Sequence, residues 1–291
     1  MRTAPMRSLK VVRYGAASTS RAAKADSCDA APSGVDDHVI TEEPLEIRLA
    51  GDTLAITMRT PGNDRELVLG FLWAEGVITA LDQVAGIVHC GPPNSDQFEN
   101  CIDVTPSETM RLTQAAHVGL RRGTMTTSAC GVCGRRTIDD LLARCAPVVS
   151  ATAMTTAALA HAALQLKQAQ PLFAECGGCH GAALVNVRGE VIAAYEDVGR
   201  HNAVDKLIGA QLLASDNATS GFAASAALIV SGRTSFEIVQ KAVAAGIGIV
   251  AGISAASSLA IDTAQRARVT LVGFVRNSEL VIYTHPERIT R

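Results

Sequence analysis

The most regular part of this chain is residues 226–253, A-A-L-I-V-S-G-R-T-S-F-E-I-V-Q-K-A-V-A-A-G-I-G-I-V-A-G-I. Short apolar runs at 226–231 and 247–253 predict two strands. Between them, residues 235–245 predict a helix. Strand, helix and strand in this order are typical of an α/β unit with parallel strands.

The same alternation continues on both sides of this unit. Further strands are predicted at 182–187, 190–195, 269–275 and 280–284, and further helices at 155–169, 200–213 and 257–266. Residues 151–291 are therefore expected to form a layered α/β domain with a mostly parallel centre.

The first half of the chain has a different pattern. Two alternating runs, 44–50 and 53–60, flank Gly51-Asp52 and predict a β-hairpin. A helix is expected at 63–75, with Asn63 or Asp64 as N-cap and Gly76 just past its end, followed by strands at 84–90 and 99–104 and a helix at 137–144. We expect an α+β domain over 39–150. Residues 1–38 are expected to be largely disordered, apart from a short strand at 9–14, because 15–37 contain almost no large apolar side chains.

Composition excludes several classes of protein. A net charge of −2 gives no electrostatic reason to expect nucleic acid or a membrane surface as partner. The uncharged run 242–261 has the length of a membrane span, but its Gly, Ala and Ser content favours a helix end, a buried strand and a new helix. Eight cysteines without a secretory signal indicate a reducing, cytoplasmic location.

A cysteine pair lies in the loop-like segment 123–139, where Cys130 and Cys133 are flanked by Arg135, Arg136 and glycines. Nearby guanidinium groups lower the pKa of a thiol and so favour the reactive thiolate. At this spacing one sulfur can be loaded and the other can resolve the intermediate. The alternatives are half of a zinc site or two incidental cysteines.

Ligands of α/β sheets bind beyond the carboxyl ends of the strands. Three such junctions, at 231–237, 253–259 and 274–279, carry groups suited to phosphate, among them Arg233, Ser257, Ser258 and Arg276. Thr234 and Glu237 also have capping-box spacing. We expect an anionic ligand, although hydroxyls at helix starts are often only caps. The stretch 196–206 contains many charged groups around His201. Such a cluster is typical of a functional site, but it can also be a solvated first helical turn held by ion pairs.

A second pair, Cys176 and Cys179, precedes His180. Together with Cys130 and Cys133 it could supply four thiolates to a structural zinc. The gap of 42 residues between the pairs is longer than zinc motifs usually have, and it contains a predicted helix.

Several stretches together resemble the formate dehydrogenase accessory sulfurtransferases, the FdhD family, over residues 39–286. They are T-E-E-P-L-E-I-R-L (41–49), T-P-G-N-D-R-E-L-V-L-G-F-L-W-A-E-G-V-I (60–78), S-A-C-G-V-C-G (128–134), E-D-V-G-R-H-N-A-V-D-K (196–206), S-G-R-T-S-F-E-I-V-Q-K (231–241) and I-S-A-A-S-S-L-A-I-D (253–262).

The resemblance implies a sulfurtransferase that works through a cysteine persulfide. Such a protein takes sulfur from a cysteine desulfurase and passes it to the bis-molybdopterin guanine dinucleotide cofactor required by formate dehydrogenase. It also implies a cytidine-deaminase-like three-layer α/β C-terminal domain, a homodimer and a site that a GDP-like nucleotide can occupy. Cys130 would carry the persulfide with Cys133 as its partner, and the segment Phe274, Val275, Arg276, Asn277, Ser278 and Glu279 matches the one assigned to the cofactor.

The chain departs from the family pattern at Cys176 and Cys179, where the family usually has T-G-G-x-H, and at Ala256 and Arg135, where it usually has proline and lysine. The extra thiols leave open whether Cys130 and Cys133 are the only reactive pair. Two other readings stay open as well: a cofactor-binding chaperone that moves no sulfur, and a zinc-stabilised binding module.

Overall fold

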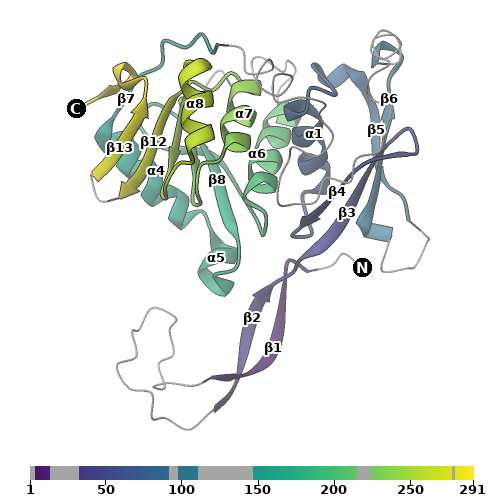
Figure 1. Cartoon of the computed structure of the whole chain (residues 1–291). Helices are drawn as coiled ribbons and strands as arrows, with labels where there is room; N and C mark the ends of the chain where they lie inside the picture. The colour runs from purple at the N-terminus through teal and green to yellow at the C-terminus, as the bar shows by residue number, and fades with distance from the viewer. Residues whose placement is uncertain are drawn as a thin grey trace.

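The computed structural model describes residues 4–13, 33–91, 98–110, 147–214, 222, 225–276 and 279–291. In this part of the chain, a four-stranded and a six-stranded sheet are joined by helices that pack between them (Figure 1). The α/β class expected from the sequence is confirmed.

The N-terminal unit is a four-stranded sheet covered on one face by a helix. Its strands lie in the order β4-β3-β6-β5, with β3 and β6 parallel and the other pairs antiparallel. Leu45, Ile47 and Ile102 of the sheet pack against Leu67 and Leu72 of the helix, and all five are buried. The elements are β3 (Glu43–Leu49), β4 (Asp52–Arg59), α1 (Asp64–Ala74), β5 (Val84–His89) and β6 (Cys101–Pro106).

The turn of the predicted hairpin is shifted by one residue. Leu49 pairs with Asp52, so the turn residues are Ala50 and Gly51 rather than Gly51 and Asp52. Both have positive φ, 52° and 85°, as a type I′ turn requires. The C-terminal signal of α1 was read correctly, because Gly76 has φ of 63° just past the helix end.

The C-terminal unit is built on a mixed six-stranded sheet in the order β13-β12-β11-β10-β8-β9. Its centre is parallel, since β10 pairs with β11 and β11 with β12 in parallel, and the remaining pairs are antiparallel. The strands are β8 (His180–Val185), β9 (Val191–Asp197), β10 (Ala227–Val230), β11 (Ile249–Gly252), β12 (Thr270–Arg276) and β13 (Glu279–Thr284).

Helices cover both faces of this sheet, which makes three layers. One face packs against α6 (Arg200–Ala214), α7 (Phe236–Ala244) and α8 (Ser258–Arg266). The other face packs against α4 (Thr156–Gln168). Alternate residues of one strand serve the two cores, as Leu228 faces the first and Ile229 the second. The three-layer arrangement expected for this half is therefore present.

Helices α1 and α6 join the two units at very short range (Figure 1). A Cβ atom at Gly70 would overlap the carbonyl of Asp205, and one at Gly209 would overlap the carbonyl of Glu66. The Trp73 Nε1–H donates to the Ala244 carbonyl oxygen at 2.8 Å, which ties α1 to the end of α7 as well. Glycine on each helix is what lets the backbones approach.

The shorter elements include three that the sequence did not predict, a helix and two short strands. A one-and-a-half-turn helix, α5 (Pro171–Cys176), begins at a proline, and β7 (Met154–Thr155) pairs with β14 (Ile289–Thr290) near the C-terminus. The 3-10 turns are η1 (Leu81–Gln83), η2 (Phe98–Asn100) and η3 (Pro286–Arg288).

The uncharged run 242–261 is divided, as expected, between the end of α7, the strand β11 and the start of α8. Across the described ranges, no helix has both the length and the apolar character needed to cross a bilayer.

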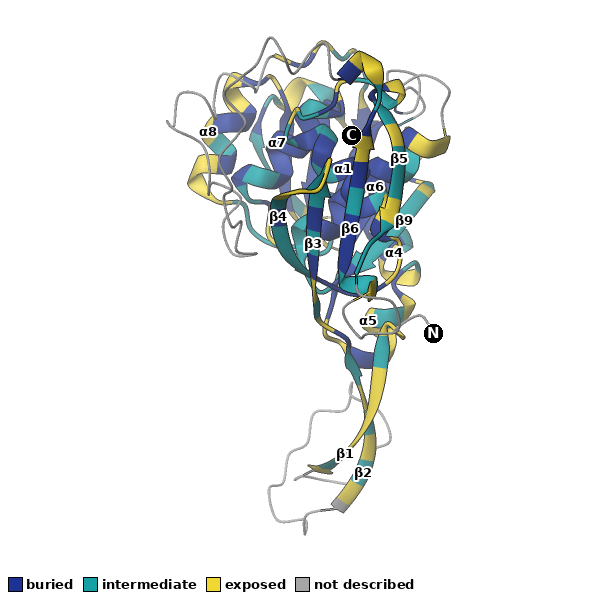
Figure 2. Ribbon diagram, turned by 90° about the vertical axis from the view of Figure 1, so that its right-hand side faces the viewer, coloured by how far each residue is buried: buried dark blue, intermediate teal, exposed yellow. Residues whose placement is uncertain are grey.

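The expectation of disorder up to residue 38 is wrong for its last part. Strand β1 (Met6–Arg13) pairs antiparallel with β2 (Ser33–Ile40), and the two form a ribbon that projects from the body (Figures 1 and 2). Backbone pairing and side-chain ion pairs hold this ribbon rather than a buried apolar face, so the lack of large apolar residues misled the prediction. Arg7 bonds Glu43 at 3.1 Å, and His38 lies 2.7 Å from Glu175. Residues 14–32 and the predicted helix 137–144 lie outside the described residues.

The close contact of α1 and α6 predicts that adding one methyl group at the helix interface destabilises the protein. We expect Gly209→Ala to lower the free energy of unfolding by about 2–3 kcal/mol, because the helices must separate. The melting temperature should fall by roughly 5–10 °C, measured by calorimetry. Gly34→Ala is the control, since a Cβ there meets no heavy atom within 4 Å. Equal melting temperatures for the two variants would contradict the close packing.

Candidate functional site

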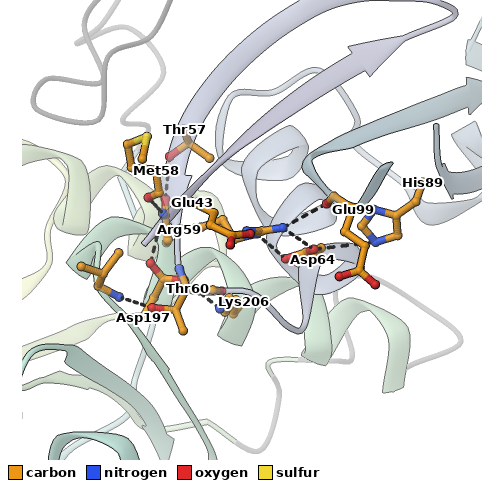
Figure 3. A network of polar contacts seen from close by, with 12 residues as sticks. Glu43, Thr57, Met58, Arg59, Thr60, Asp64, His89, Glu99, Asp197 and Lys206 are labelled. Atoms are coloured by element: carbon orange, nitrogen blue, oxygen red, sulfur yellow. Dashed lines mark hydrogen bonds and ion pairs between the residues drawn. The ribbon is translucent and has the colours of Figure 1, made fainter. Parts of the chain in front are cut away.

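A buried carboxylate, Asp197, fixes the position of the turn between β9 and α6 (Figure 3). It accepts hydrogen bonds from the backbone N–H groups of Thr60 and Gly199 at 3.1 and 2.8 Å. Lys206 Nζ lies 2.7 Å from it and also donates to the Thr60 carbonyl. Burial raises the pKa of Asp197, and the charge of Lys206 opposes that shift. The end of β4 is thereby tied to the start of α6.

A second buried ion pair supports the same strand end from the other side (Figure 3). The guanidinium of Arg59, which has no exposed surface, donates to both carboxylate oxygens of Asp64 at 2.9 and 3.1 Å. It also donates to the Glu99 carbonyl at 3.0 Å. This bidentate geometry sets the direction in which the chain leaves β4 and enters α1.

Between the two units lies a pocket of about 210 Å³, which we call the interdomain pocket. Its walls combine acidic, basic and apolar groups from β4, α1, α6 and α7. They are Glu42, Thr57, Met58, Leu67, Phe71, Glu75, His180, Val198, Gly199, Arg200, His201, Asn202, Asp205, Glu237 and Lys241. The pocket is smaller than the range of about 300–1,000 Å³ typical of ligand sites, so it can hold only part of a large ligand.

His201 is held between two residues of the β10–α7 junction. Its Nε2 lies 2.9 Å from Ser235 Oγ, and its Nδ1 lies 2.9 Å from Glu237 Oε2. Since an ionised carboxylate only accepts, Nδ1 donates to Glu237, and Nε2 is paired with the Ser235 hydroxyl. The expected capping box of Thr234 and Glu237 is wrong, because Ser235 is the N-cap residue and its hydroxyl is directed to His201. The arrangement fixes the orientation of the imidazole ring at the pocket wall.

His180 and the guanidinium of Arg200 lie side by side in the wall of the same pocket. Gly232 lies beside both, since a Cβ there would come 3.2 Å from His180 Nδ1 and 3.8 Å from Arg200 Cδ. Burial lowers the pKa of His180, and the charge of Arg200 lowers it further. The Nε–H of Arg200 is buried and has no acceptor within the described part of the chain. A buried donor without an acceptor suits an anionic ligand.

The floor of the pocket holds a fully buried ion pair. Lys241 Nζ lies 2.7 Å from Asp205 Oδ1. Burial raises the pKa of Asp205 to about 7, against the opposing charge of Lys241. Most of the charged cluster predicted at 196–206 is thus structural, and Glu196 likewise accepts from the backbone N–H groups of Leu172 and Phe173 at the start of α5. Arg200 is the member of this cluster that lines the pocket with a buried N–H group left without an acceptor among the described residues.

The three predicted junctions at the strand ends lie side by side. Thr234 N–H donates to the Ala255 carbonyl at 3.1 Å, and Ser257 N–H donates to the Thr234 carbonyl at 3.0 Å. Phe274 N–H donates to the Ser254 carbonyl at 3.1 Å. The loops after β10, β11 and β12 therefore form one continuous edge, on which Arg233, Ser257 and Ser258 are exposed. Ser257 also has the simpler role, because its Oγ caps α8 by accepting from Ala260 N–H at 3.3 Å.

Phe274 has the most unusual backbone on this edge. Its φ is 54°, a region that bulky residues rarely adopt, and the β12–β13 register is irregular around it. Its side chain remains 42% exposed. It lines an open hollow of about 740 Å³ with Arg276 and Glu279, whereas Val275 is buried beneath. Backbone strain of this kind is concentrated at functional sites.

The predicted site residues thus fall into two separate places. His201 belongs to the interdomain pocket, and Phe274, Arg276 and Glu279 belong to the hollow at the β12–β13 turn. Arg233 lies on the loop between β10 and α7. Cys130, Cys133, Asn277 and Ser278 lie outside the described residues.

The second cysteine pair is inaccessible. Cys176 and Cys179 are buried, and the Cys179 thiol donates to Glu196 Oε1 at 3.2 Å. Burial raises the pKa of Cys179 strongly, which disfavours the thiolate that a metal or a sulfur transfer requires. Over the ranges that the structure describes, no cluster of three or more His, Cys, Asp or Glu side chains could hold a metal ion.

Sequence reasoning missed the wall of the pocket that comes from the N-terminal unit. Thr57, Met58 and Phe71 belong to elements that were predicted correctly, but nothing in their spacing indicates a site. The one signal in the sequence was Gly70 in the middle of a helix. Glycine there lowers helix stability, and close packing against another element can offset that loss.

The electrostatics of the pocket predict how His180 titrates. We expect its pKa below 6.5, and a partial rise in Arg200→Gln, since burial is the larger cause and remains. Because the unfolded chain then binds a proton that the folded chain does not, this group reduces stability as the pH falls below 6.5. NMR of the imidazole resonances, assigned with His180→Gln, measures both values. An unchanged pKa in Arg200→Gln would show that Arg200 does not act on His180.

Comparison with known proteins identifies the family. The FdhD/NarQ family model matches residues 40–290. A protein named sulfur carrier protein FdhD from Anaeromyxobacter dehalogenans (strain 2CP-C) is 48% identical over 257 residues, which cover 88% of this chain and 89% of that protein. Proteins of the same name from Sulfurisphaera tokodaii and Streptomyces coelicolor are 44% and 42% identical, covering 87% and 90% of this chain and 92% of each relative.

The fold is also found in a solved structure. The crystal structure of a candidate formate dehydrogenase accessory protein from Desulfotalea psychrophila superposes with a TM-score of 0.72, at 23% identity, covering 99% of this chain and 100% of the other. With the family model matched over nearly the whole length, this chain belongs to the FdhD/NarQ family.

Proposed function

We propose that this protein is a sulfurtransferase that carries persulfide sulfur from a cysteine desulfurase to the bis-molybdopterin guanine dinucleotide cofactor of formate dehydrogenase. The observation that carries the proposal is the 48% identity, over 88% of the chain, to a protein named as a sulfur carrier. Cys130 is the residue that takes the sulfur, with Cys133 beside it in sequence.

The chemistry needs two thiols that act in turn. The Cys130 thiolate attacks the outer sulfur of the desulfurase persulfide, which leaves the desulfurase as thiolate and Cys130 as persulfide. Cys133 then attacks the inner sulfur of that persulfide, and the outer sulfur departs as hydrosulfide toward the metal centre. The resulting Cys130–Cys133 disulfide is reduced by an external thiol before the next cycle.

The cofactor is a substrate in this scheme, and the strand-end edge suits it. Phe274 offers an exposed aromatic face on which a guanine base can stack. Arg233 and Arg276 offer guanidinium groups for the pyrophosphate of the dinucleotide or of a GDP-like nucleotide. Arg200 and His201 offer a donor and a fixed imidazole to an anionic group in the interdomain pocket.

The same proposal includes the partners and the place of action. We propose a homodimer that meets a cysteine desulfurase and formate dehydrogenase in the cytoplasm. A carrier of the cofactor that moves no sulfur is the competing function, and the exposed Phe274 would suit it equally well. Sulfur loading separates the two.

Loading of Cys130 is the first test. After incubation with a cysteine desulfurase and cysteine, intact-mass analysis should show one added sulfur atom that maps to the peptide with Cys130. Cys130→Ala should lose the added mass completely, because no thiolate is left to attack.

Cys179→Ala is the matched control and should load normally, since the Cys179 thiol is buried and protonated. Loading that persists in Cys130→Ala, or that maps to Cys179, would overturn the assignment. A chain that never loads but still supports cofactor insertion would be a chaperone.

Nucleotide binding is the second test. Phe274→Ala should weaken GDP binding about tenfold or more, because stacking on an aromatic ring contributes about 1–3 kcal/mol per base. Calorimetric titration measures the dissociation constant. Phe173→Ala is the control, since its ring is 44% exposed against 42% for Phe274 but lies on α5. Equal affinity of the two variants would place the guanine elsewhere.

A further inference from the structure

Two further cysteines, Cys90 and Cys101, meet in the N-terminal sheet, whereas Cys28 and Cys145 lie outside the described residues. Cys90 follows β5 and Cys101 begins β6, directly opposite each other in the antiparallel ladder, where Cys90 N–H donates to the Cys101 carbonyl at 2.8 Å. Their sulfur atoms are 3.2 Å apart. Both are free thiols. Two thiols already in contact need little movement to form a bond.

The pair lies on the face of the sheet turned away from α1. Glu46 is the register partner of Cys101 in β3, and it alternates with Leu45 and Ile47, which point into the core under α1. Arg48 lies on the same outer face and bonds the Glu46 carboxylate at 2.9 and 3.0 Å. The Arg48 guanidinium also interacts electrostatically with both thiols. The charge of Arg48 lowers the pKa of Cys101, against the larger effect of burial.

The two thiols differ in access. Cys90 is partly exposed, whereas Cys101 is 6% exposed. Burial, followed by the hydrogen bond with Cys90, raises the pKa of Cys101 to about 12. Cys90 is therefore the thiol that an external reagent can reach, and Cys101 is placed to react second.

We propose that Cys90 and Cys101 form a reversible redox site, oxidised to a cross-strand disulfide by low-molecular-weight disulfides such as glutathione disulfide. Cys90 attacks the disulfide, forms a mixed disulfide and releases one thiolate. Cys101 then attacks the Cys90 sulfur, forms the Cys90–Cys101 bond and releases the second thiolate. The two cysteines lose two electrons and two protons, and the reagent takes up both as two thiols. The site is separate from the Cys130 chemistry and does not depend on it.

Formation of the Cys90–Cys101 disulfide would stabilise two contacts that reach the buried Arg59–Asp64 ion pair (Figure 3). The strand end that carries Cys90 also places His89 within 3.7 Å of Asp64. The turn η2, which leads into Cys101, provides the Glu99 carbonyl that accepts from Arg59. A covalent bond between the two strand ends would hold both contacts together.

The test uses the full-length chain with Cys28→Ser, Cys130→Ser, Cys133→Ser and Cys145→Ser, so that the cysteines outside the described residues cannot react. After reduction and treatment with glutathione disulfide, the protein should lose two hydrogens in intact mass and carry no glutathione. Proteolytic cleavage after Asp96 and Glu99 places Cys90 and Cys101 on different peptides. If the two peptides are found linked before reduction and separate after it, the Cys90–Cys101 disulfide is identified. Dithiothreitol should restore both thiols.

Single variants establish the order of the steps. In the same background, Cys101→Ser should hold one glutathione on Cys90, since nothing resolves the mixed disulfide. Cys90→Ser should react at least about tenfold more slowly, because Cys101 is buried and protonated. Cys176→Ser is the matched control and should still form the link.

Two outcomes would overturn the proposal, and both are measured without changing Cys90 or Cys101. One is a stable glutathione adduct on Cys90 in the presence of Cys101. The other is full alkylation of both thiols after the oxidant has been removed.

Discussion

The contact between α1 and α6 is the constraint on which the rest of the structure depends. Gly70 and Gly209 let two helix backbones meet with no side chain between them. That contact brings the end of β4 close to the turn before α6. There Asp197 accepts a hydrogen bond from the Thr60 backbone N–H and forms an ion pair with Lys206. The burial pattern agrees, since dark, buried segments run from the four-stranded sheet through both helices without an exposed layer between them (Figure 2).

The charged groups at this joint are paired with opposite charges, and that is why they can be buried. Asp197 has four hydrogen-bonding or ionic partners, and Arg59 is matched by Asp64 and a backbone carbonyl. Removing one member of such a group leaves a buried charge uncompensated, which typically costs about 3–5 kcal/mol. The network therefore gives the joint one geometry rather than adding much net stability, and the interdomain pocket inherits that precision.

The sequence was informative where one periodicity dominates. The strands and helices between residues 180 and 284 were predicted within a few residues, because apolar runs alternate cleanly with helical spacing. The ribbon strand β2 was missed, since the adjacent Asp36 and Asp37 interrupt any apolar–polar alternation and no buried face marks a strand. The partners of His201 were also beyond reach, because Ser235 lies 34 residues further along and only the β10–α7 turn brings it back. Spacing predicted that the strand ends carry ligand groups, but only tertiary pairing between Thr234 and Ala256 brings those ends together.

The shared walls of the interdomain pocket have a thermodynamic consequence. Met58 and Phe71 come from one unit, and His201 and Glu237 come from the other. A molecule held among them is bound only while the units are docked, so by mass action it strengthens their association, by about 2.7 kcal/mol at a hundred times its dissociation constant. The free energy of association between the two units therefore reports whether the interdomain pocket is occupied.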